Sequence, residues 1–151
     1  MEVKNNNESG IPTGPCQKTA RISLGLLMLL AGIGHLSFQR LEFRAQVPNW
    51  VPLAKDTTVV LSGIAEIALG TAMIASRKQR PKVGLLLGLF YIAVFPGNIS
   101  QYLNERNAFG LNNDSTRLAR LFFQPVLIYW ALWSTGAHRH LRQLKPAAKR
   151  R

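Results

Sequence analysis

Residues 83–103 read VGLLLGLFYIAVFPGNISQYL, and none of these side chains carries a charge. A helix needs about twenty mostly apolar residues to cross the roughly 30 Å hydrocarbon core of a bilayer. A helix on the surface of a soluble protein would instead show charged residues along one face. This stretch therefore predicts a helix that spans a membrane.

Three further blocks of similar length and composition surround this stretch. The block at residues 20–38 has its only arginine at the edge, and none of the first three blocks has a charged face. The chain of 151 residues is long enough for one domain. We therefore predict an all-α protein, an integral membrane four-helix bundle, with helices at residues 20–38, 57–76, 83–103 and 117–135.

The segments outside the four blocks are polar, and their charges indicate how the bundle is oriented. Residues 1–19 are expected to form a polar, disordered tail, and residues 136–151 a basic tail. These tails, the edge of the first helix and the connection at 77–82 carry 13 of the 19 Lys and Arg residues, all on one side. Because basic residues concentrate on the cytoplasmic side, we expect both termini in the cytoplasm and a multi-pass protein of the bacterial cytoplasmic membrane.

One acidic residue interrupts the second block, which reads VVLSGIAEIALGTAMIA over residues 59–75. Glu66 falls at its centre, where a charge costs roughly 2.5–3.5 kcal/mol on insertion scales. Ionisable residues at this depth rarely face lipid and commonly mark functional sites. Gly63 and Gly70 share the helix face of Glu66, and small residues let a neighbouring helix approach closely. Glu66 is therefore expected to point into the bundle.

The other three helices each carry one polar residue on the face that is expected to pack inward. At about 1.5 Å per residue, these polar residues lie near mid-membrane or in the half away from the basic tails. Trp50 lies in the connection at residues 39–56, whose prolines indicate an extended segment near the headgroups. We therefore predict one binding site that contains Glu66, Asn98, His35 and Gln124, with Trp50 near its mouth.

Composition and spacing exclude several classes of function. The net charge of +12 mostly reflects orientation, and the basic residues are not interleaved with exposed aromatics, so no nucleic acid is expected as a partner. Cys16 is the only cysteine, which excludes a disulfide within the chain and a thiol-exchange pair. The sequence shows no ligand set for a metal, a haem or a flavin, so no metal and no covalently bound cofactor are expected.

Five segments occur in order along the chain: AGIGHLSF, VPNWVPLAKD, LSGIAEIALGTAMI, LGLFYIAVFPGNI and LARLFFQPVLIYWALW. Together they resemble the DoxX-like family of small four-helix bacterial membrane proteins over about residues 20–135. The Ser-Gly-x-x-Glu element ending at Glu66 is the most specific, followed by Phe-Pro-x-Asn-Ile around Asn98. The last helix departs from the family, which usually has a proline shortly before the position of Gln124. The resemblance implies the fold and, through namesakes associated with a thiosulfate:quinone oxidoreductase, a link to redox complexes.

Two classes of function are compatible with these residues. In the first, the chain is an accessory or quinone-site subunit of a redox-linked membrane complex, with Glu66 and His35 as proton donors beside a quinone. It then needs a redox partner protein, because the chain has no redox centre of its own. The alternative is a non-catalytic partner that assembles or stabilises another membrane protein. A proton or small-solute pathway is a third option, and a second copy of the chain is a further candidate partner within the lipid bilayer.

Overall fold

The computed structural model describes residues 11–105 and 113–148, which form six helices and no strand. The predicted all-α class is therefore confirmed for this part of the chain. Residues 1–10 and 149–151 of the two predicted tails lie outside the described residues. The helices are α1 (Pro15–Leu36), α2 (Arg40–Gln46), α3 (Lys55–Ala75), α4 (Arg80–Leu103), α5 (Asp114–Thr135) and α6 (Ala137–Ala148).

Three of these helices are long and apolar enough to cross a membrane. They are α1, α3 and α4, with 22, 21 and 24 residues. The remaining long helix, α5, has 22 residues. Its first two turns contain Asp114, Arg117 and Arg120, which make it less apolar than the other three. Helices of membrane-spanning length and composition thus occur at three of the four predicted blocks.

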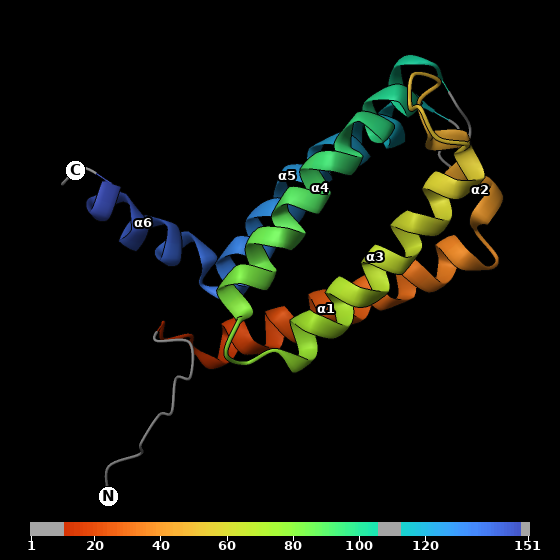
Figure 1. Ribbon diagram of the computed structural model, residues 1–151. Helices are drawn as coiled ribbons and strands as arrows, with labels where there is room; N and C mark the ends of the chain where they lie inside the picture. The colour runs from red at the N-terminus through yellow and green to blue at the C-terminus, as the bar shows by residue number, and fades with distance from the viewer. Residues whose placement is uncertain (1–10, 106–112, 149–151) are drawn as a thin grey trace, which may run out of the picture.

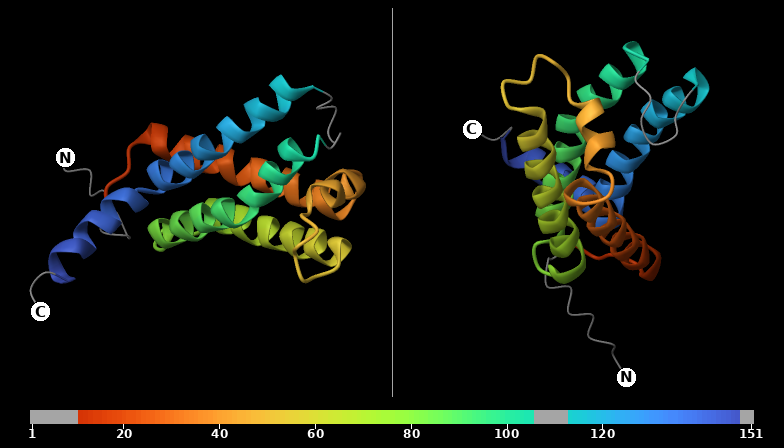
Figure 2. Two further views of the ribbon diagram at one scale, coloured as in Figure 1. Left: turned by 90° about the horizontal axis from the view of Figure 1, so that it is seen from above. Right: turned by 90° about the vertical axis from the view of Figure 1, so that its right-hand side faces the viewer.

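The four long helices form two antiparallel pairs. α1 packs along α3, and α4 packs along α5, while α1 and α5 share a smaller contact. The two pairs meet at the end that holds the start of α1, the α3–α4 connection and α6, which we name the basic end. They diverge toward the opposite end, which holds α2 and which we name the α2 end (Figures 1 and 2).

Two pairs of glycines allow α1 and α3 to pack closely. A Cβ atom at Gly32 would lie 2.7 Å from the carbonyl oxygen of Gly63, and one at Gly70 would lie 2.8 Å from that of Gly25. Side chains do not come this close to a backbone, so the two helices can touch here only at glycines. The predicted stripe of small residues around Glu66 is thus the α1–α3 interface, and it sets the register of the two helices.

We expect Gly32→Ala to lower the free energy of unfolding by about 1–3 kcal/mol, because the added methyl group must push α1 away from α3. Gly88→Ala is the matched control, since a Cβ at Gly88 would lie an ordinary 3.4 Å from the nearest atom, in the Leu132 side chain. Thermal unfolding of the purified protein in detergent compares the two. Equal effects of both substitutions would contradict this register.

The start of α1 differs from the sequence expectation. The helix begins at Pro15 rather than residue 20, and Ile11 is buried, so the predicted disordered tail of residues 1–19 is too long. Proline suits the first helical position because its missing N–H would have no helical partner there. The side chain of Gln17 accepts a hydrogen bond from the backbone N–H of Gly14 at 3.1 Å, which stabilises this start.

Two short helices also differ from the expectation. The connection at residues 39–56, expected to be extended, contains the seven-residue α2, and the basic tail contains the twelve-residue α6. Pro48 and Pro52 restrict their own conformation and that of the preceding residue. They therefore leave residues 40–46 free to form a helix.

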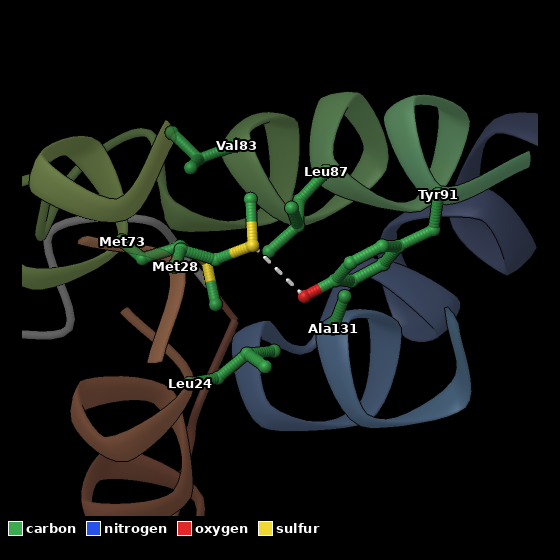
Figure 3. Packing of buried hydrophobic residues seen from close by; sticks show 7 residues of the cluster. All are labelled: Leu24, Met28, Met73, Val83, Leu87, Tyr91 and Ala131. Carbon is green, nitrogen blue, oxygen red and sulfur yellow. Dashed lines mark hydrogen bonds between the residues drawn. The ribbon is translucent and has the colours of Figure 1, made fainter. Parts of the chain in front are cut away.

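The hydrophobic core is shared by the four long helices and lies on the basic-end side of the predicted polar residues. In α1 its residues precede His35, and in α3 they follow Glu66. The Tyr91 hydroxyl donates a hydrogen bond to the sulfur of Met28 at 3.0 Å. We name this cluster the apolar layer; Figure 3 shows its members, Leu24, Met28, Met73, Val83, Leu87, Tyr91 and Ala131.

Candidate functional site

His35 and Glu66 form a close polar pair between α1 and α3. His35 lies in the last turn of α1, and Glu66 lies near the middle of α3. His35 Nδ1 is 2.7 Å from Glu66 Oε2, and the two residues are only 7% and 8% exposed. A Cβ at Gly63 would lie 2.8 Å from the Cβ of His35, so this glycine makes room for the pair. Both side chains therefore point into the bundle, as their helix faces predict.

The surroundings of His35 Nδ1 indicate which of its ring nitrogens carries a hydrogen. Nδ1 lies 3.0 Å from the carbonyl oxygen of Ala31, and a carbonyl can only accept, so Nδ1 is the donor. Glu66 Oε2 lies close to this N–H but off its direction. Among the described residues, this fully buried oxygen accepts no well-aligned hydrogen bond. The carboxylate thus keeps acceptor capacity for a further donor.

The ring of His35 also forms part of the wall of a cavity. The ring of Phe43, from α2, stacks on it with centroids 3.3 Å apart and planes 16° apart. The cavity has a volume of about 370 Å³ and lies between α2, the connection that follows it, α3 and α4. Its lining is mostly apolar with a few polar groups, which is typical of small-molecule sites. The aromatic and polar side chains that line it are His35, Phe43, Gln46, Trp50, Thr58, Ser62 and Phe90.

An ion pair holds α2 beside this cavity. Arg40 Nε donates to Asp56 Oδ1 at 2.8 Å, and a second guanidinium nitrogen donates to Oδ2. Two parallel hydrogen bonds of this kind fix the orientation of the guanidinium. The hydrogen bond to Asp56 raises the pKa of Arg40 above its ordinary value. The pair thus ties the start of α2 to the start of α3.

Asn98 and Gln124 form a second polar pair, between α4 and α5. Asn98 Nδ2 donates to Gln124 Oε1 at 2.9 Å, and Gln124 Nε2 donates to the carbonyl oxygen of Tyr91 at 2.7 Å. These hydrogen bonds join the two helices. Tyr91 thus bonds to both sides, because its carbonyl oxygen accepts from Gln124 of α5 while its hydroxyl donates to Met28 of α1.

A further group of polar side chains extends from the cavity wall toward the α2 end. Gln46 Nε2 donates to Gln101 Oε1 at 2.7 Å, and Arg120 Nη2 donates to Gln46 Oε1 at 3.2 Å. Gln101 is 1% exposed. Because both the nitrogen and the oxygen of the Gln46 amide form hydrogen bonds, the orientation of this side chain in the cavity wall is fixed.

The structure distributes the five predicted site residues over the cavity and the two polar pairs. His35 and Trp50 line the cavity. Glu66 is not part of the lining but contacts His35. Asn98 and Gln124 bond to each other instead of joining the first pair. The role of all five in binding a ligand stays a prediction.

Of the predicted site residues only His35 and Trp50 line the cavity, and the lining residues that the sequence prediction missed include Phe43 and Gln46 of α2. They are three residues apart, so they share a face of α2 only if that segment is helical. The segment QRLEFRAQ contains good helix formers, and its leucine, phenylalanine and alanine could have indicated a short helix. The prolines that follow it favour the opposite interpretation.

A family described as Domain of unknown function (DUF8561) matches residues 24–135 of the chain. The chain therefore belongs to this family. The match extends from α1 to the last residue of α5 and includes all five predicted site residues. No curated protein and no solved structure matches the chain.

Proposed function

We propose that α5 crosses the membrane together with α1, α3 and α4, and that the basic end lies in the cytoplasm of a bacterial cell. Arg117 and Gln124 of α5 are only 6% and 5% exposed, so these polar side chains face protein. Phe122, Phe123 and Tyr129 are at least half exposed and offer an apolar surface to lipid. The bias of Lys and Arg toward the basic end supports the orientation.

Single cysteines in a Cys16→Ser background test this topology. Asn49→Cys lies at the α2 end and Gln143→Cys lies on α6, and both positions are exposed. In intact cells, an impermeant thiol reagent should label position 49 at once and position 143 only after lysis. Labelling of both in intact cells would show that α5 does not cross, and labelling of 143 alone would reverse the orientation.

We propose that the cavity binds the ring of a lipid-soluble quinone, as the quinone site of a redox-linked membrane complex. The observation that carries this proposal is the His35–Glu66 pair at the wall of a cavity lined by aromatic rings. Side chains such as Phe43 and Phe90 favour planar ligands. A bound quinone would take up or release electrons together with protons. His35 holds a hydrogen on Nδ1, and Glu66 is the adjacent group that can take up or return a proton.

The resemblance to the DoxX-like family supports a redox role in which a partner protein supplies electrons. The apolar layer argues against a proton or solute pathway, because Leu24, Met73 and Leu87 are at most 1% exposed and buried water needs polar partners. A non-catalytic role in assembling another membrane protein is the second candidate, favoured by the large apolar surfaces that the helices expose.

Quenching of tryptophan fluorescence by a short-chain ubiquinone analogue tests the proposed site. Trp50 lines the cavity, so a bound ring should quench it in a saturable way. Trp50→Phe assigns the signal, since the chain has three tryptophans. Absence of saturable quenching would count against the quinone site. In that case, a membrane protein that copurifies in stoichiometric amount from native membranes would support the assembly role.

A further inference from the structure

The basic end carries many cations and, among the described residues, no acid. Basic side chains come from the start of α1, from residues 77–82 and from α6. The acids of the described ranges lie in α2, in α3 and next to the α4–α5 connection. The positive charge at this end is therefore not compensated by nearby carboxylates of the described chain.

Two arginines at this end, Arg80 and Arg139, donate hydrogen bonds to neutral oxygens. Arg80 donates to the carbonyl oxygen of Ile11. Arg139 donates to the carbonyl oxygen of Pro12 at 2.8 Å and to Gln17 Oε1 at 3.1 Å. A carbonyl or amide oxygen satisfies a donor without cancelling its charge. These contacts also fix the start of α6, because Arg139 ties it to the segment that enters α1.

α6 is an amphipathic helix that leaves the bundle. It turns away from α5 at Gly136, which has a φ of 74°, and projects beyond the other helices (Figures 1 and 2). In the sequence of α6, apolar residues recur at positions 137, 141, 144 and 148, which is the spacing of one helix face, and Ala137 at its start is buried against the bundle. Leu141 on this face is 40% exposed. Arg139 and Arg142 occupy other faces of the helix.

We propose that α6 docks on the anionic phospholipid surface of the cytoplasmic leaflet, with its apolar face in the headgroup region. Basic amphipathic helices bind in this way through apolar burial and attraction to anionic lipid. The fold places the start of α6 directly after α5, where the proposed membrane span ends. The uncompensated arginines beside it add to the attraction. The proposal rests on the proposed orientation for the choice of leaflet.

A spin label on α6 tests the docking in the full chain. Gln143→Cys, in a Cys16→Ser background, carries the label, and the protein is reconstituted in vesicles of phosphatidylcholine alone or mixed with phosphatidylglycerol. In the anionic vesicles we expect the label, which lies on the polar side of α6, to become less mobile and to lie closer to the headgroups, and to regain its mobility at high salt. Arg142→Gln should lower the docked-to-free ratio about fivefold, as expected for one charge at a membrane surface.

Lys55→Gln is the matched control, because it removes one positive charge at the α2 end and should leave the ratio unchanged. Equal mobility and depth of the label in both kinds of vesicle would overturn the proposal. A label that stays mobile on lipid but is immobilised by an acidic protein partner would overturn it as well. Both leaflets of these vesicles are anionic, so the result is independent of the direction in which the protein inserts. A wrong orientation would be detected separately, by the cysteine labelling.

Discussion

His35→Ala should lower the free energy of unfolding by about 3 kcal/mol, because it leaves the buried carboxyl group of Glu66 without the polar group that faces it. Glu66 Oε2 is fully buried, and it loses the N–H that lies 2.7 Å away. The same substitution should abolish the saturable quenching of Trp50 by the quinone analogue, since the imidazole is a polar group of the cavity wall. Denaturant unfolding and fluorescence titration measure the two effects.

The double variant His35→Ala with Glu66→Gln separates stability from binding. Glu66→Gln removes the carboxylate that requires His35, so the double variant should regain most of the lost stability while binding stays lost. His138→Ala is the control, because this histidine lies at the basic end, away from the cavity. The Glu66→Gln single variant completes the comparison. If the losses of stability in His35→Ala and Glu66→Gln add up to the loss in the double variant, the two residues are not coupled and the pair has no special role.

Arg21→Met should lower the free energy of unfolding by about 2–3 kcal/mol, because carbonyls at a helix end would lose a charged donor. Arg21 is 5% exposed, and its guanidinium donates to the carbonyl oxygens of Met73 and Ile74, the latter at 3.2 Å. These carbonyls belong to the last turn of α3, where the helix itself provides no N–H partner. Methionine keeps a similar length but cannot donate.

Arg77→Met is the matched control for this prediction. Arg77 lies at the same end but is exposed, so its loss should change the stability by less than about 0.5 kcal/mol. Thermal unfolding of both variants in the same detergent gives the comparison. Equal losses would mean that α3 ends stably without Arg21.

The packing of α1 on α3 could be predicted, because close packing of two helices requires only small residues at helical spacing. Gly63 and Gly70 bracket Glu66 at helical spacing, and only such small residues allow two backbones to touch. α6 could have been recognised from apolar residues every three or four positions. α2 is harder, because its stability depends on tertiary contact: Phe43 stacks on His35, which no local pattern reveals.

For the candidate site, the sequence could predict which helix face each polar residue occupies and how deep it lies in the membrane. It could not predict which of these side chains contact one another. Helical periodicity places His35, Glu66 and Gln124 toward the interior, and all three are buried. Which side chains meet depends on how the two helix pairs are inclined to each other. Because the pairs diverge toward the α2 end, Asn98 is bonded to the neighbouring α5 instead of reaching the His35–Glu66 pair.

The apolar layer separates the His35–Glu66 pair from the basic end. In the proposed orientation, the cavity and the pair would therefore exchange with the outer side of the membrane, because the buried side chains of Leu24, Met73 and Leu87 lie between them and the cytoplasmic end. An inhibitor that cannot cross the membrane should then reach the site in intact cells.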